Sequence, residues 1–268
     1  MQKRRYALRL AYDGSAFRGF QRQPGLVTVQ GSVEDALARL CGRVRIQAAA
    51  RTDAGVHAVD QVVTFNTRAQ LDPVALRTAV NAHTPPALVC LDAAPVPRSV
   101  HARASARSRT YVYLVGWPAP EELRGHAWSL PDPRAFREID HPVVDLTRGR
   151  SALALIVGEH DFGGFARSGE QTRRRAVDTR ATVATVTRAT IIAASGLPLA
   201  AFVLEGESFV RAMIRNVVGT VVAVALGLAQ PSIVTQMLLA PGERYRGVRA
   251  PGWGLTLARV AYPRPLFS

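Results

Sequence analysis

The sequence predicts an α+β protein with two similar halves, in each of which a sheet is backed by helices. Short apolar segments with the alternation typical of strands are interleaved with segments of helical periodicity. In the first part of the chain the order is strand, helix, strand, turn, strand, helix, strand, as in a split βαβ (ferredoxin-like) unit. The second part contains the same ingredients without an evident sequence repeat, so the similarity of the halves is inferred from the order of elements.

An N-terminal domain is predicted for residues 1–104. Its strands are expected at 6–12, 44–50, 61–67 and 87–96. An amphipathic helix is expected at 28–40, and a second helix at 71–82 begins at Asp72-Pro73, a typical helix start.

A C-terminal domain is predicted for residues 105–268. Its strands are expected at 111–115, 182–194, 199–205 and 255–262. Its helices are expected at 151–157, 209–226 and 230–239. The segment 116–146 is rich in proline and charge, and its weak periodicity leaves its structure open.

The charge of the chain indicates a polyanionic partner. The formal net charge is +14, and Lys3 is the only lysine among 34 basic residues. A genome that favours arginine codons explains arginine over lysine but not the excess of basic over acidic residues. Nucleic acid is therefore the expected partner, and arginine suits RNA because it binds phosphate and stacks on bases.

Membrane and secreted classes are not favoured. No apolar run approaches the roughly 20 residues needed to span a bilayer, and no signal peptide is suggested. Two cysteines, Cys41 and Cys90, are too few for a disulfide framework or a cysteine-based zinc site. We expect a cytoplasmic protein.

The strongest candidate site is the polar segment at residues 51–58, between two apolar runs. Gly55 suits a sharp turn, from which Asp53 and Arg51 would project. A lone Asp-Ala-Gly is usually only a turn. The presence of Arg51, Thr52 and His57 within a few residues favours a functional site, in which the flanking strands hold Asp53 rigidly as a reactive carboxylate.

A second chemical signal lies in the helix expected at 209–226. This segment is apolar around most of its circumference, but Arg211, Arg215 and Gly219 share one stripe. A buried arginine needs an anion. Asp53, a structural carboxylate and a substrate phosphate are all candidates, and the residues alone do not choose among them. Gly219 would let another backbone segment come close.

Three further segments fit contact with nucleic acid. Residues 15–24 combine aromatic rings, arginines and amides, which either bind bases and phosphates or fill a core. Residues 98–109 form the most basic window and are interpreted as an RNA-facing arm rather than a linker. The run Arg173–Arg175 lies in a polar loop and is either solvated or in contact with phosphate.

These residues resemble the tRNA pseudouridine synthase A (TruA-type) family over nearly the whole chain. The most specific motif is Arg-Thr-Asp-Ala-Gly-Val-His-Ala at 51–58. The other matching motifs follow in the family's order: Tyr12-Asp13-Gly14, Phe17, Gly19, Gln21, Gln23-Pro24, Thr28-Val29-Gln30-Gly31, Glu34, Gln61, His101-Ala102-Arg103, Arg109-Thr110-Tyr111-Val112-Tyr113, His160-Asp161-Phe162, Phe209-Val210, Arg215-Asn216, Gly219 and Gly254-Leu255. The chain departs from the family at Phe20, Ala50 and Val100, which affects the expected loop geometry but not the expected reactive groups.

The resemblance implies the pseudouridine synthase fold, with a mainly antiparallel central sheet and an active-site cleft between the halves. It implies isomerisation of uridine to pseudouridine at three successive positions of the tRNA anticodon stem-loop, by base flipping and without cofactor or metal. It also implies a homodimer whose tRNA contacts both subunits.

The resemblance also implies residue roles. Asp53 matches the catalytic aspartate, Tyr111 the ring that stacks on the flipped uracil, and Arg215 the arginine that pairs with the aspartate. Leu255 matches the apolar wall under the base, and Arg51 looks placed to support the flipped nucleotide. Further candidates for substrate contact are His57, Gln61, Phe20, Arg22, Arg103 and Arg109.

Two alternatives are considered. The first is a noncatalytic RNA-binding protein on the same scaffold, which would not need a carboxylate facing its polyanionic ligand. The second is a metal-dependent hydrolase that uses Asp53, His57 and Asp60.

Overall fold

A computed structural model shows that the chain folds into two compact units. One comprises residues 1–109 together with 256–268, and the other comprises residues 110–255. The structure describes residues 3–136, 139, 142–166, 182–243 and 245–267, so the run Arg173–Arg175 lies outside the described residues. The domain boundary predicted at 104/105 differs from this division, which lies after residue 109 and places residues 256–268 in the first unit.

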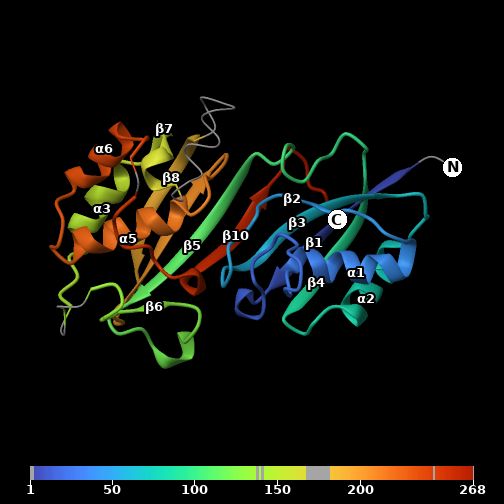
Figure 1. The fold of residues 1–268 in the computed structure, drawn as a ribbon, viewed down its shortest axis with the longest axis horizontal. Helices are drawn as coiled ribbons and strands as arrows, with labels where there is room; N and C mark the ends of the chain where they lie inside the picture. The colour runs from blue at the N-terminus through green and yellow to red at the C-terminus, as the bar shows by residue number, and fades with distance from the viewer. Residues whose placement is uncertain (1–2, 137–138, 140–141, 167–181, 244, 268) are drawn as a thin grey trace. The chain divides into compact units, whose positions relative to one another are not determined.

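In the first unit the strands follow the order β4-β1-β3-β10 (Figure 1). Its strands and helices are β1 (Arg4–Tyr12), α1 (Val29–Cys41), β2 (Gln47–Ala48), β3 (His57–Thr67), α2 (Pro73–His83), β4 (Leu88–Val96) and, apart from its first residue, β10 (Leu255–Ala261). β1 pairs antiparallel with β3 and β4, the short β2 pairs antiparallel with β3, and β10 pairs parallel with β3. Helices α1 and α2 pack against each other, and α2 also packs against β4.

The pairing of β1 with β3 is interrupted near the candidate site. Leu10 pairs with Gln61, but Tyr12 pairs with Ala58, so β3 carries one extra residue at this point. Such a bulge bends and twists a strand pair and redirects nearby side chains.

In the second unit the strands follow the order β5-β9-β8-β7 (Figure 1). Its strands and helices are β5 (Ser108–Gly116), β6 (Trp128–Ser129), α3 (Leu146–Ala154), β7 (Gly158–Asp161), β8 (Val183–Ala193), β9 (Leu199–Gly206), α5 (Met213–Ala225) and α6 (Ser232–Leu239). β8 pairs antiparallel with β7 and β9, and α3 and α6 pack against α5. The predicted α+β class with mainly antiparallel pairing is confirmed.

Most predicted elements are present, but three predictions need correction. The strand expected at 44–50 is reduced to β2, and the helix expected at 151–157 lies earlier, at Leu146–Ala154. This helix begins there because the Asp145 side chain accepts hydrogen bonds from the N–H groups of Thr147 and Arg148.

The third correction concerns the arginine stripe on α5. The helix begins at Met213, after Ala212 in the left-handed region with φ of 63°. Arg211 therefore precedes the helix and is exposed, and Arg215 is partly rather than fully buried. The stripe is reduced to Arg215 and Gly219.

Within the described ranges, no helix has both the length and the apolar character that crossing a membrane requires.

Candidate active site

Asp53 lies on the turn that the sequence predicted. Gly55 has φ of 78°, in the left-handed region, and the Val56 N–H donates to the Asp53 carbonyl at 3.2 Å. β3 begins two residues after Gly55. Arg51 and Ala54 are exposed, whereas Asp53 is partly buried. The turn thus presents a carboxylate and a guanidinium at the end of a core strand.

Gln61 holds the segment that leads into this turn. Gln61 lies on β3 and is fully buried, with an exposed fraction of 0%. The Ala50 N–H donates to Gln61 Oε1 at 3.2 Å, and Gln61 Nε2 donates to the Ala50 carbonyl at 2.9 Å. The amide therefore binds Ala50 as a neighbouring strand would, where β2 has already ended.

Tyr12 and Thr52 form the next buried contact. Tyr12 lies at the end of β1, and its Oη is 2.8 Å from Thr52 Oγ1. Burial raises the pKa of Tyr12 to about 12, against the opposing effect of its hydrogen bonds with Thr52 and Gln61. The phenol is therefore neutral at physiological pH and keeps a proton to donate.

Arg109 holds the same segment through its guanidinium. This residue is 6% exposed. Its Nε and Nη2 donate to the Ala49 carbonyl at 3.3 and 3.1 Å, and Nη2 donates to the Arg103 carbonyl at 2.6 Å. Arg109 therefore connects the predicted basic arm to the backbone before Asp53.

The loop after β1 packs closely on the turn. The Phe20 N–H donates to the Thr52 carbonyl at 3.0 Å. A Cβ on Gly14 would lie 2.1 Å from the Val56 carbonyl oxygen, so only glycine fits there. Phe20 is 3% exposed, which places its ring in the core, one of the two roles that the sequence left open for aromatic residues of this loop.

His57 is buried beneath this loop. It is 4% exposed, and its Nδ1 accepts from the Gly14 N–H at 3.2 Å and lies 3.2 Å from Asp13 Oδ1. Its imidazole thus connects the start of β3 to the end of β1.

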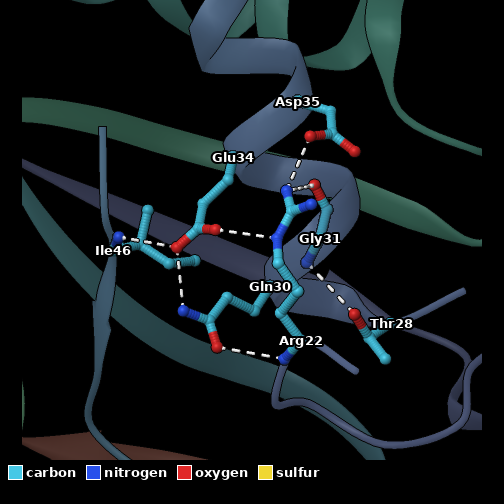
Figure 2. Close-up of polar contacts among 7 residues, drawn as sticks. All are labelled: Arg22, Thr28, Gln30, Gly31, Glu34, Asp35 and Ile46. Atoms are coloured by element: carbon cyan, nitrogen blue, oxygen red, sulfur yellow. Dashed lines mark hydrogen bonds and ion pairs between the residues drawn. The ribbon is translucent and has the colours of Figure 1, made fainter. Parts of the chain in front are cut away.

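Arg22 is bound by the first turns of α1 (Figure 2). Its Nε donates to Glu34 at 3.0 Å, and its Nη2 donates to the Gly31 carbonyl at 3.0 Å and to Asp35 at 2.6 Å. Glu34 also accepts from the Ile46 N–H at 3.1 Å, so one carboxylate connects the loop, the helix and the segment before β2. Two carboxylates thus offset the charge of a residue predicted to bind substrate.

The basic arm is an ordered segment with exposed arginines. The Ala102 N–H donates to Thr64 Oγ1 at 3.2 Å, and Tyr262 Oη donates to the Ala102 carbonyl at 2.6 Å. Arg103 and Arg107 are exposed. The backbone of the arm is therefore fixed while these two side chains face solvent.

Three other predicted site residues lie in the second unit. Tyr111 is 7% exposed, and its ring meets that of Phe209 edge to face, with centroids 5.3 Å apart. Arg215 Nε donates to the Ala250 carbonyl at 2.7 Å, and the Ala250 N–H donates to the Arg215 carbonyl at 3.1 Å. Leu255 is 5% exposed.

The segment bound by Arg215 approaches α5 closely at Gly219, as the sequence predicted. A Cβ on Gly219 would lie 1.8 Å from the Val248 carbonyl oxygen. Tyr245 Oη donates to the Val248 carbonyl at 2.7 Å and fixes the same segment.

Comparisons with known proteins show which family the chain belongs to. A sequence model described as tRNA pseudouridine synthase matches residues 10–103 and 152–263. The chain is 38% identical to the tRNA pseudouridine synthase A of Cereibacter sphaeroides (strain KD131), over 98% of this chain and 99% of that protein. It is also 38% identical to that of Bordetella parapertussis, over 97% of this chain and 91% of that protein, and 35% identical to that of Thermosipho africanus, over 97% and 100%. The chain belongs to the tRNA pseudouridine synthase family.

The enzyme is therefore an isomerase that acts on uridine in tRNA. The family match includes Asp53, Arg215 and Leu255 and leaves out 104–151, which contains Tyr111. Asp53 belongs to one compact unit and the other three to the second. The predicted pairing of Asp53 with Arg215 stays a prediction.

The metal-hydrolase alternative finds no support in the placement of Asp60. Its Oδ1 accepts from Arg9 Nε at 2.7 Å, and its Oδ2 accepts from the Val260 N–H at 2.8 Å, which ties β10 to β3. Across the described part of the chain, no group of three or more metal-ligating residues is placed to hold an ion.

Sequence reasoning missed the structural role of Tyr12. The motif Tyr12-Asp13-Gly14 was noticed, but not that the phenol reaches Thr52. The available signal was a tyrosine at the inward-facing end of a core strand, because a buried tyrosine hydroxyl usually finds a hydrogen-bond partner.

Proposed function

We propose that this enzyme isomerises uridine to pseudouridine in the anticodon stem-loop of tRNA, with Asp53 as its catalytic carboxylate. The observation that carries the proposal is the position of Asp53, on a glycine turn whose preceding residues, 49–52, are bound by the buried side chains of Gln61, Tyr12 and Arg109. A fixed carboxylate can meet a reacting atom without first losing conformational freedom.

The chemistry requires one group to act in both directions. The bond between uracil N1 and the sugar C1′ must break, the base must turn, and a bond between C5 and C1′ must form. The C5 proton then leaves and N1 gains a proton, so the product is an isomer. Asp53 would act first as nucleophile or base, by attack on the sugar, attack on the ring or removal of a sugar proton, and would later take part in the return of a proton.

We assign four supporting roles from the family resemblance. Tyr111 would stack on the flipped uracil, and Leu255 would form the apolar wall under it. Arg215 would pair with Asp53 and keep the carboxylate ionised. Arg51, which is exposed beside Asp53, would support the flipped nucleotide.

Binding of tRNA would rest on exposed arginines. Arg103 and Arg107 on the ordered arm are suited to phosphate, because each neutralised phosphate releases counterions. We also propose a cytoplasmic homodimer whose tRNA contacts both subunits. Light scattering of the free enzyme and of its tRNA complex tests the dimeric state directly.

Asp53→Asn is the decisive variant. It removes the charge and the nucleophile with little change in shape, so we expect pseudouridine formation to be lost while the tRNA affinity is kept. Unmodified tRNA labelled with tritium at uridine C5 reports the reaction through tritium release, and mapping of pseudouridine at nucleotide resolution identifies the site.

Asp72→Asn is the matched control. Asp72 caps α2 by accepting from the Ala75 N–H at 2.8 Å, and asparagine caps a helix about as well as aspartate. This variant should keep wild-type turnover. Turnover by purified Asp53→Asn at the wild-type rate would rule out the catalytic role. If Asp53→Asn and the Asp72→Asn control both bound tRNA tightly and neither formed pseudouridine, the noncatalytic alternative would be favoured.

A further inference from the structure

We propose that Tyr12, Thr52 and Gln61 form a positioning network for Asp53, which no comparison assigns and which rests on the proposed function of Asp53. The three side chains come from β1, the loop before Asp53 and β3. All three are buried, with exposed fractions of 5%, 7% and 0%.

The hydrogen-bond geometry fixes the orientation of the Gln61 amide within the network. The Ala50 N–H can only donate, so the oxygen of the Gln61 amide must face it. The Gln61 Nε2 hydrogens then point to the Ala50 carbonyl at 2.9 Å and to Tyr12 Oη at 3.4 Å. Tyr12 Oη accepts from Gln61 and shares a second hydrogen bond, of 2.8 Å, with Thr52 Oγ1, in which either hydroxyl can be the donor.

The network therefore binds the chain at Ala50 and at Thr52, on both sides of Arg51. Thr52 is adjacent to Asp53, and its carbonyl accepts from the Phe20 N–H at 3.0 Å. A shift of Thr52 would move Asp53 with it, and a small misplacement of a reacting group is costly in rate.

The strand irregularity near Tyr12 supports the same interpretation. The extra residue of β3 lies between Ala58 and Gln61, which pair with Tyr12 and Leu10. The irregularity is therefore next to Tyr12, whose hydroxyl contacts Thr52. Bulges of this kind often lie beside active sites, where they redirect a side chain.

Burial raises the pKa of Tyr12, so the phenol stays protonated within this network. Gln61 acts through the backbone in this network, which accounts for its presence near the site without a contact to substrate.

The test compares Tyr12→Phe with Tyr6→Phe. Both tyrosines are buried in β1 and use their hydroxyl in a hydrogen bond, but Tyr6 accepts from the Leu71 N–H at 2.8 Å, on another segment. Both substitutions thus remove a tyrosine hydroxyl from β1. Tyr12→Phe removes the hydroxyl that contacts the loop before Asp53, and Tyr6→Phe removes the one that contacts Leu71. Residue Thr52 provides a second pair, Thr52→Val and the conservative Thr52→Ser.

We expect Tyr12→Phe to lower kcat about tenfold, the factor that corresponds to the loss of one hydrogen bond, and to leave KM for tRNA unchanged. Thr52→Val should do the same, and Thr52→Ser should keep most of kcat. The double variant with Tyr12→Phe and Thr52→Val should lose no more kcat than the less active of the two single variants. Tyr6→Phe should lower Tm by about as much as Tyr12→Phe does, but it should leave kcat unchanged.

Hydrogen exchange of the peptide covering residues 49–56 gives a readout that needs no turnover. Tyr12→Phe should accelerate its exchange, and Tyr6→Phe should not. Wild-type exchange and kcat in Tyr12→Phe, or equal kcat losses in both phenylalanine variants, would overturn the positioning role. A wild-type protein that forms no pseudouridine would overturn the proposed function, while the exchange comparison would still decide whether the network holds the loop.

Discussion

Replacement of Arg109 by methionine removes the buried guanidinium and keeps most of the length of the side chain. The guanidinium donates twice to the Ala49 carbonyl, at 3.3 and 3.1 Å, and once to the Arg103 carbonyl at 2.6 Å. Methionine can fill the space left by the stem but donates to neither carbonyl. Ala49 is 2% exposed, so water has little access to the carbonyl that loses its partner.

The expected cost follows from these contacts. A hydrogen bond from a charged group contributes roughly 1.5–3 kcal/mol, and a buried acceptor left without a partner costs a similar amount. We therefore expect the free energy of unfolding to fall by about 3 kcal/mol. For a chain of this size, that corresponds to a decrease in Tm of roughly 6–12 °C.

Arg107→Met is the matched control for this prediction. Arg107 lies two residues earlier and is exposed, and its backbone N–H, which the substitution leaves in place, donates to the Ala261 carbonyl at 2.8 Å. Its replacement should leave Tm unchanged, weaken tRNA binding and reduce the slope of affinity against salt by about 1, as expected for one lost phosphate contact.

Thermal unfolding followed by circular dichroism and tRNA binding measured across salt concentrations separate the two roles. The reasoning is refuted if Arg109→Met keeps the wild-type Tm and loses tRNA affinity with a reduced salt slope. That outcome would place the guanidinium on RNA, as predicted from the sequence.

Two further predictions concern packing and pH. Gly219→Ala should lower the free energy of unfolding by about 1–3 kcal/mol, because its Cβ would lie 1.8 Å from the Val248 carbonyl oxygen; an unchanged midpoint of urea unfolding would contradict this close approach. Stability should also fall as pH rises from about 10 to about 12. Burial raises the pKa of Tyr12 and of Tyr245 to about 12, so the unfolded chain ionises first and the contribution present below pH 10 is lost. Urea midpoints measured across this range check the decline, which should be shallower in Tyr12→Phe.

The sequence alone predicted the features that depend on neighbouring residues. Alternation located β1, β8, β9 and β10, because side chains on a strand face opposite sides. Gly55 between Asp53 and His57 predicted the turn, and Gly219 predicted a close backbone approach. Local pattern was weakest where a cap decided the boundary, as at Asp145, or where the backbone changed conformation, as at Ala212 before α5.

The tertiary structure decided what the polar side chains near Asp53 bind. Gln61, Arg109 and Phe20 were all predicted to contact substrate, and the structure buries all three against the backbone or core of the first unit. Their sequence types fit either role, because an amide or a guanidinium binds a carbonyl as readily as it binds RNA. The partner of Arg109 is 60 residues away in the chain, a separation at which periodicity carries no information. Asp53 itself was found from its neighbours, but the side chains that hold its loop were identified only after β1 and β3 had been placed side by side.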